Sequence, residues 1–226
     1  MSKRTQRLAV ALMVVAASSA VEAQVPVRAS ITATGEASVS ANPDQAMLSF
    51  SVLTTAVTAV DAGNLNASQT SGVISALRAV MGASDTLKTI SYSLNPNYNN
   101  AAMLTGYTAV NSIQVTTGDL ASTGRLIDTA TQAGVSRVQS LSFGLKDAQP
   151  LRAQALKLAA GQAQTQVGAI AAGLGVKLGV VIAASDGSTV STLVLSAPGV
   201  ATVTPIVSGT VQVSASVRLQ VEVLGQ

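Results

Sequence analysis

Few side chains able to carry out chemistry occur in this chain of 226 residues, which contains no Cys, His or Trp. Without Cys and His there is no thiolate nucleophile, no imidazole base and no disulfide, and the usual ligands of zinc, haem and iron–sulfur clusters are missing. Carboxylates and hydroxyls remain. They leave three kinds of site open: an oxygen-ligated Mg²⁺ or Ca²⁺ ion, a Ser/Lys pair, or paired carboxylates.

Three aspartates stand just before segments with a helical apolar pattern: Asp61, Asp119 and Asp147. A carboxylate in that position accepts hydrogen bonds from the first free backbone N–H groups of a helix. Helix capping therefore explains these three side chains better than catalysis does.

Four other acidic residues also have structural explanations. Asp44 and Asp186 lie in the turn sequences Asn-Pro-Asp and Asp-Gly, while Glu36 and Glu222 lie on the polar sides of alternating strands. No pattern brings two carboxylates together, and no Gly-x-Ser-x-Gly elbow appears. The sequence predicts no catalytic, metal-binding or cofactor-binding residue, and we expect that the protein is not an enzyme.

Three further motifs allow both a functional and a structural interpretation. Gly173-Leu174-Gly175 lacks the Lys-Ser/Thr pair and the third glycine of nucleotide loops, so it indicates a helix end. Asn66-Ala67-Ser68 matches a glycosylation sequon but falls on a predicted helix. For the three tyrosines, packing or an interface is favoured over ligand stacking; they are Tyr92, Tyr98 and Tyr107.

The N-terminus has the layout of a secretory signal peptide. Three basic residues precede the apolar run 8–17, and small residues follow up to a cleavage point after Ala23 or Ala20. The apolar run is shorter than the roughly 18–20 residues of a membrane span, which leaves an uncleaved anchor as the less favoured alternative. We predict a signal peptide over residues 1–23 and a mature protein in the periplasm or the medium.

Removal of residues 1–23 changes the charge balance. The full chain carries +3, and the mature chain, which loses three basic residues and one acidic residue, has ten basic and nine acidic side chains. A net charge of +1 gives no reason to expect a nucleic-acid partner. No later segment is apolar enough to span a membrane. Only 10% of residues are charged, so we expect weak repulsion between copies and a homo-oligomer.

Strand signals dominate both ends of the mature chain. The runs 31–39 and 45–55 alternate apolar and polar residues around the turn signal 42–44, which predicts a long β-hairpin. The run 211–223 alternates over its whole length, with only two charges and no Pro. Such a strand is a template for pairing, either with the opening hairpin or with another subunit.

Helices and strands interleave between these ends. Helical spacing appears over 62–81, between Asp119 and Gly134, and over 150–174; strands are predicted at 87–94, 107–117, 135–143 and 176–185, with a loop at 95–98 and a loop excursion at 186–209. These elements predict an α+β fold with helices packed on one face of mainly antiparallel sheets, in a single domain over residues 24–226.

Six short segments match one family in their order and spacing: 31–36 (ITATGE), 88–98 (KTISYSLNPNY), 106–109 (GYTA), 133–138 (AGVSRV), 151–155 (LRAQA) and 204–209 (TPIVSG). On these segments the chain resembles the SIMPL domain family, a family of unknown function that includes bacterial periplasmic immunogenic proteins.

The resemblance implies an exported envelope protein without established catalytic residues. Some members of the family assemble into hollow rings, and some are linked to oxidative-stress tolerance. The resemblance implies that this chain could share either property. Two hypotheses follow. The first is a non-catalytic envelope protein that self-assembles into a homo-oligomer. The second is a periplasmic module that binds a small molecule or a cell-envelope component as a monomer or dimer. No cofactor is expected, and the sequence identifies no ligand.

Overall fold

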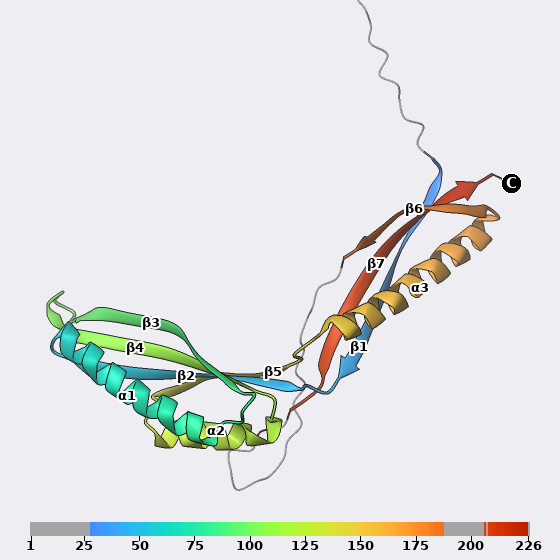
Figure 1. Ribbon diagram of the computed structural model, residues 1–226. Helices are drawn as coiled ribbons and strands as arrows, with labels where there is room; N and C mark the ends of the chain where they lie inside the picture. The colour runs from blue at the N-terminus through green and yellow to red at the C-terminus, as the bar shows by residue number, and fades with distance from the viewer. Residues whose placement is uncertain (1–27, 188–205, 207, 226) are drawn as a thin grey trace, which may run out of the picture.

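The computed structural model describes residues 28–187, 206 and 208–225, and it places their strands in two antiparallel sheets. Sheet A has the strand order β1-β7-β6 and contains β1 (Ser30–Ala41), β7 (Val211–Leu224) and β6 (Lys177–Asp186). Sheet B has the order β3-β4-β2-β5 and contains β3 (Thr86–Tyr98), β4 (Leu104–Thr117), β2 (Gln45–Ala56) and β5 (Arg137–Gly144). Figure 1 shows the sheets as two arms that meet at an angle.

Each sheet has helices on one of its faces (Figure 1). In sheet A, α3 (Gln149–Leu174) packs on β1 and β7. In sheet B, α1 (Ala59–Val80) and α2 (Thr123–Gln132) cover one face, and the short 3-10 turn Leu120–Ser122 leads into α2. The predicted α+β fold, with helices on one face of antiparallel sheets, is confirmed.

The larger core lies between sheet B and its two helices. Its fully buried side chains come from alternate strand positions and from the helix faces that meet them, and they include Leu48, Phe50, Leu77, Ile113 and Leu126. Burial of an aliphatic or aromatic side chain of this size contributes about 1.5–3 kcal/mol. This core therefore fixes both helices against β2 and β4.

Small side chains let α3 approach sheet A closely. The buried residues of α3 include Ala155, Ala159, Ala163 and Ala171, spaced at multiples of four along the helix. A Cβ atom on Gly35 of β1 would overlap the α3 backbone at Ala159 and Ala163. Position 35 therefore requires glycine because the strand and the helix backbones touch there.

The chain enters and leaves sheet B once. All of sheet B lies within residues 45–144, and the segments before and after it build sheet A. Asp44 joins the two crossings: its backbone N–H donates to the Gly144 carbonyl at 3.0 Å, and its carboxylate accepts from the Lys146 N–H at 2.7 Å. Asp44 thus ties together the two connections between the sheets, and these hydrogen bonds reach Gly144 and Lys146 instead of closing the local turn that the sequence predicts.

The predicted opening hairpin, 31–39 with 45–55, is wrong. Along its whole length β1 pairs with β7, from Ser30 opposite Glu222 to Ala41 opposite Val211, whereas β2 pairs with β4 and β5 in the other sheet. The connector 42–44 moves the chain between sheets instead of reversing it within one. Alternation defines the buried face of a strand, but it does not define the neighbouring strand.

A second difference concerns β3. The segment 95–98, expected as a loop, continues the strand through Pro96 to Tyr98. Because β3 is an edge strand, Pro96 is tolerated where a central strand would need its N–H. The three helices and the terminal strand lie where the sequence predicts them, apart from shifts of a few residues at their ends.

Two predictions fall largely outside the described residues. The signal peptide at 1–23 lies wholly outside them, and most of the excursion at 186–209 does too, although Asp186 itself ends β6. Among the helices of the described part of the chain, none combines the length and the apolarity that a membrane crossing requires.

Candidate functional site

Two of the predicted capping aspartates lie at helix starts as expected. Asp119 is the N-cap of the 3-10 turn, and its Oδ1 accepts from the Ala121 N–H at 3.1 Å. Asp147 lies one residue before Ala148, the N-cap of α3, and its Oδ1 accepts from the Gln149 N–H at 2.9 Å. Both carboxylates therefore accept a backbone N–H at a helix start, but only Asp119 is itself an N-cap.

Asp61 is not the N-cap of α1, which corrects the sequence prediction. Thr58 occupies that position: its Oγ1 accepts from the Asp61 N–H at 3.1 Å and donates to Asp61 Oδ2 at 2.6 Å. Asp61 lies in the first turn, where the helix dipole favours a carboxylate. Thr and Asp are both good capping residues, so the apolar pattern alone does not choose between them.

Two of the remaining acidic residues form ion pairs with arginines. Glu222 pairs with Arg28 at 3.2 Å, and Asp186 pairs with Arg152 at 2.7 Å. Within residues 28–187, 206 and 208–225, no three Asp, Glu, His or Cys side chains gather as a metal site would require.

Asn66 of the glycosylation sequon is fully buried under α1. Its Nδ2 donates to the carbonyls of Val52 at 3.0 Å and Ala109 at 3.2 Å, so it joins the helix to β2 and β4. A buried amide with these partners serves the fold and is not accessible for glycosylation.

The glycine motif at the end of α3 is a helix terminus. Gly175 is the C-cap and has a left-handed backbone with φ of 69°, a conformation that favours glycine. Of the tyrosines, Tyr92 and Tyr98 are exposed on the edge strand β3, and Tyr107 is half-buried on β4. The exposed pair is consistent with the interface role that the sequence favours.

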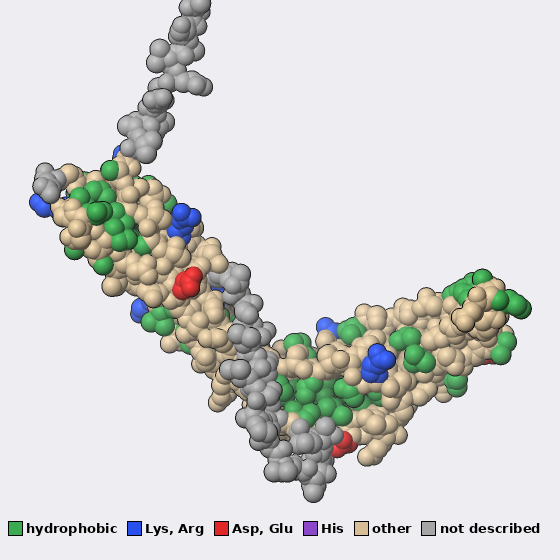
Figure 2. Space-filling view, turned by 180° about the vertical axis from the view of Figure 1, so that it is seen from behind, with side chains coloured by type: hydrophobic (Ala, Val, Ile, Leu, Met, Phe, Trp, Pro, Cys, Tyr) green, Lys and Arg blue, Asp and Glu red, His purple; other side chains and the backbone are tan. Residues whose placement is uncertain are grey.

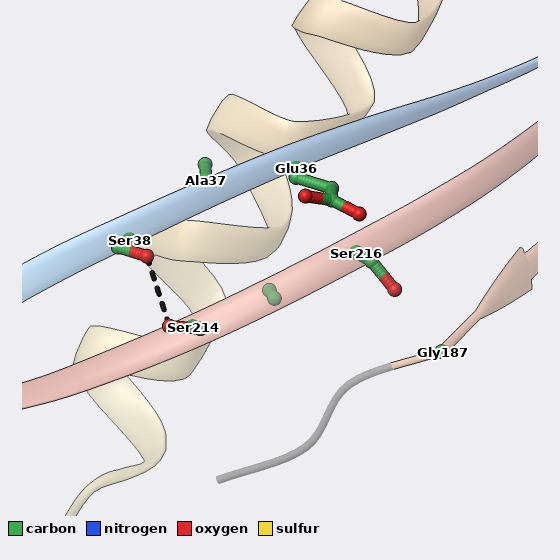
Figure 3. A pocket seen from close by; sticks show the side chains of 7 residues that line it. Glu36, Ala37, Ser38, Gly187, Ser214 and Ser216 are labelled. Atoms are coloured by element: carbon green, nitrogen blue, oxygen red, sulfur yellow. Dashed lines mark hydrogen bonds between the residues drawn. The ribbon is translucent and has the colours of Figure 1, made fainter. Parts of the chain in front are cut away.

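A hollow of about 470 Å³ lies on the face of sheet A opposite α3 (Figure 3). This serine pocket is lined by Glu36, Ala37, Ser38, Gly187, Ser214, Ala215 and Ser216. The hydroxyls of Ser38 and Ser214 are hydrogen-bonded at 2.9 Å across β1 and β7, as Figure 3 shows. Among the described residues of this lining, Glu36 alone carries a charge.

The described lining of the serine pocket offers no Lys or His to activate a serine. A serine nucleophile needs an adjacent base, and the described lining contains neither Lys nor His. Hydroxyls and one carboxylate can hydrogen-bond a polar molecule, but nothing in the described lining selects one.

A second hollow, of about 300 Å³, lies on the face of sheet B opposite the helices. This arginine pocket is lined by Ser51, Leu53, Val110, Ser136, Arg137 and Gln139. It combines a cation, hydroxyl and amide groups, and two aliphatic side chains. Sequence reasoning missed this pocket, because its residues come together only through the pairing of β2 with β4 and β5.

The outer edge of β6 is the most apolar edge of sheet A. The exposed fractions are 38% for Leu178, 62% for Val180, 55% for Val181 and 41% for Ile182. Beside them a groove of about 200 Å³ runs toward α3, and its lining includes Val167. Charged side chains are sparse on the face of the molecule in Figure 2, and hydrophobic patches appear on both arms. No described strand pairs with this edge of β6.

One family model matches almost all of the described fold. The family model SIMPL, described as a protein of unknown function (DUF541), matches residues 31–221, from β1 into β7. The chain belongs to the SIMPL family. The resemblance seen in the six short segments is thereby confirmed.

Named SIMPL relatives include two well-matched groups. A 26 kDa periplasmic immunogenic protein of Brucella melitensis is 30% identical over 166 residues, which cover 70% of this chain and 66% of the relative. An uncharacterized protein YggE of Escherichia coli K12 is 30% identical over 172 residues, which cover 75% of this chain and 70% of the relative. The match thus spans slightly less than two thirds of the Brucella protein. The name of the Brucella protein agrees with the periplasmic or secreted location that the N-terminus of this chain predicts.

Proposed function

We propose that this SIMPL protein is an exported, non-catalytic envelope protein that assembles with copies of itself, and that the outer edge of β6 is a contact between copies. The observation that carries the proposal is the exposed apolar centre of β6, from Leu178 to Ile182. Natural edge strands are usually protected by charges, Pro or a covering element, because an open edge pairs readily with another strand. Between Lys177 and Asp186, β6 contains neither a charge nor a Pro.

The position of α3 leaves this edge open. The helix packs mainly on β1 and β7, so the groove beside β6 is bounded by Val167 on the helix and by Leu178 and Val181 on the strand. Aliphatic side chains of a second copy can fill this groove, which removes apolar surface from water at about 25 cal/mol per Å². A second copy therefore covers both the backbone edge and its apolar side chains.

The charges at the ends of β6 are complementary under antiparallel pairing. Lys177 begins the strand and Asp186 ends it. When two copies of β6 pair antiparallel about their centre, the Lys177 end of each copy lies beside the Asp186 end of the other. Asp186 already accepts a bond from Arg152 at 2.7 Å, and a carboxylate has capacity for more than one donor.

Larger assemblies require a second contact, because a two-fold interface closes on a dimer. The outer edge of β3 is suited to it. This strand of 13 residues has one charged side chain, Lys88, and exposes Ile90, Tyr92 and Tyr98. Exposed tyrosines are enriched at interfaces between proteins.

Oxidative-stress tolerance, which the family resemblance implies, belongs to the same proposal. A chain without Cys has no thiol that could act as a redox sensor. We therefore attribute any such role to the assembled surface and not to thiol redox chemistry.

The lack of Cys in the sequence permits a direct test by cross-linking. In Val181→Cys, two copies paired through β6 bring their thiols close to the two-fold axis, and mild oxidation should link most chains into covalent dimers. Val60→Cys is the control, because Val60 is exposed to 69% and lies on α1 beside sheet B, not on β6. Equal cross-linking of the two variants at about 10 µM protein, or none in Val181→Cys, contradicts a β6 contact.

A further inference from the structure

We infer that the arginine pocket binds the carboxylate of a small aliphatic acid, with the carboxylate on Arg137 and the aliphatic part against Leu53 and Val110. This site does not depend on self-assembly through β6. It gives the second hypothesis, a small-molecule binding module, a defined place on sheet B.

The charge of Arg137 has no counterpart in its own sheet. The strands β2, β3, β4 and β5 contain no Asp or Glu, and their only charged residues are Lys88 and Arg137. Arg137 has no ion-pair partner within the described part of the chain, where Arg28 pairs with Glu222 and Arg152 pairs with Asp186. A guanidinium left unpaired beside a hollow is suited to a carboxylate, which it can bind through two parallel hydrogen bonds.

The turn before Arg137 is held on both sides, so the start of β5 is fixed in place. The Ser136 N–H donates to the Ser51 carbonyl at 2.9 Å, and Ser136 Oγ accepts from the Leu53 N–H at 2.9 Å. Earlier in the same turn, Gln69 of α1 donates to the Gly134 carbonyl at 2.6 Å. A fixed backbone lowers the entropic cost of using the Arg137 side chain in binding.

A bulge in β5 adds a polar group to the same face. Ser49 pairs with Ser140 and Phe50 pairs with Val138, so Gln139 is the extra residue on β5. Its Nε2 reaches over β2 to Ser112 on β4 at 3.3 Å. Bulges often redirect a side chain next to a binding site, and here the bulge places an amide beside the guanidinium.

The remaining wall of the arginine pocket is apolar. This property distinguishes the pocket from a site that would bind any anion. Leu53 is 46% exposed, and Val110 lies opposite it in the β2–β4 pairing. A phosphate or sulfate ion would gain nothing from these two side chains, whereas an alkyl chain attached to a carboxylate buries apolar surface against them. The chemistry of the pocket therefore favours an aliphatic carboxylic acid over an inorganic anion.

Hexanoate and its neutral amide, hexanamide, test this inference on the purified full-length protein by calorimetric titration. We expect hexanoate to bind one site per chain with a Kd of about 1–10 mM, as suits a small ligand in an open pocket. Hexanamide should bind at least about tenfold more weakly, because it has no charge to pair with Arg137. Absence of saturable binding, or equal binding of acid and amide, overturns the inference.

Three variants locate the site. Arg137→Gln should weaken hexanoate binding about tenfold, while Lys88→Gln, which removes the other charge of the same sheet, should change it less than about twofold. Leu53→Ser should weaken hexanoate but leave acetate unchanged, because acetate has no alkyl chain to bury. If Arg137→Gln and Lys88→Gln weaken hexanoate binding equally, the ligand is attracted to the charge of the whole sheet, and the proposed site is wrong. The site is also wrong if Leu53→Ser still prefers hexanoate to acetate as strongly as the unmodified protein does. The melting temperature confirms that each variant is folded.

Discussion

The side-chain oxygen of Gln162 on α3 accepts a hydrogen bond of 2.6 Å from the backbone N–H of Glu36 on β1. An N–H of an edge strand, which a neighbouring strand could otherwise use, is thus taken by the helix. The same helix contacts the β1 backbone at Gly35. One edge of sheet A is therefore partly occupied by α3, and β6 provides the open edge.

Gly35→Ala should destabilise the protein, because the new Cβ would overlap the α3 backbone at Ala159 and Ala163. Neither backbone can rotate away as a side chain could, so strand and helix must separate. We expect a loss of about 1–3 kcal/mol in the free energy of unfolding, the usual range for overpacking. Urea unfolding followed by circular dichroism measures it.

Gly161→Ala is the control on the same helix. Gly161 lies in α3, and an alanine methyl group there would have no neighbouring atom within 4 Å, so it meets open space. The substitution should stabilise the helix by about 0.5–1 kcal/mol. If both alanine variants change stability in the same direction, the close contact at Gly35 does not exist in solution.

Asn66→Ala should also lower stability, by about 1–3 kcal/mol, because it removes the amide that donates to the carbonyls of Val52 and Ala109 and leaves a cavity under α1. Asn64→Ala, at an exposed position of the same helix, should shift it by less than about 0.5 kcal/mol. Thermal unfolding of the two variants compares them directly. Equal melting temperatures would argue against a buried bonding role for Asn66.

The buried faces of strands and the ends of helices could be predicted from the sequence, because they depend on local chemistry. Alternation over 211–223 identifies the buried side of β7, and Asp119 and Asp147 indicate helix starts through their carboxylates. Asp61 shows the limit of such reasoning. Thr58 competes for the same cap, and only the three-dimensional geometry decides between them.

The partner of each strand could not be predicted from the sequence, because pairing depends on how distant segments meet. The connector 42–44 has the residues of a hairpin turn, yet it moves the chain from sheet A to sheet B. Pro96 marks a loop in sequence but lies within β3, because an edge strand tolerates its missing N–H.

The candidate binding residues follow the same logic. Arg137 is one basic residue among thirteen in the sequence, with no motif around it that points to a ligand. Its significance comes from the neighbouring strands, which supply Leu53 and Val110 and contain no carboxylate. No single-sequence pattern reports which charges will be left without a partner in a sheet.

A paired substitution distinguishes the open face of sheet A from its open edge as the assembly contact. Ser214→Lys with Ser216→Lys adds two charges to the polar face of the central strand β7, beside the serine pocket. Because β7 already has neighbours on both edges, we expect this double variant to keep the assembly state of the unmodified protein. Val181→Lys, at the β6 edge, should shift the protein to smaller species in light scattering. A double variant that dissociates while Val181→Lys does not would move the contact from the edge to the face.

The most direct test of the central claim is the native mass of the purified, unmodified protein by light scattering coupled to size exclusion. Self-assembly through β6 predicts a mass that is a whole-number multiple, at least two, of the single-chain mass, which is at most 22.5 kDa. The multiple should persist at about 10 µM, well within the range where standard interfaces remain formed. A protein that elutes as a strict monomer at that concentration contradicts the account.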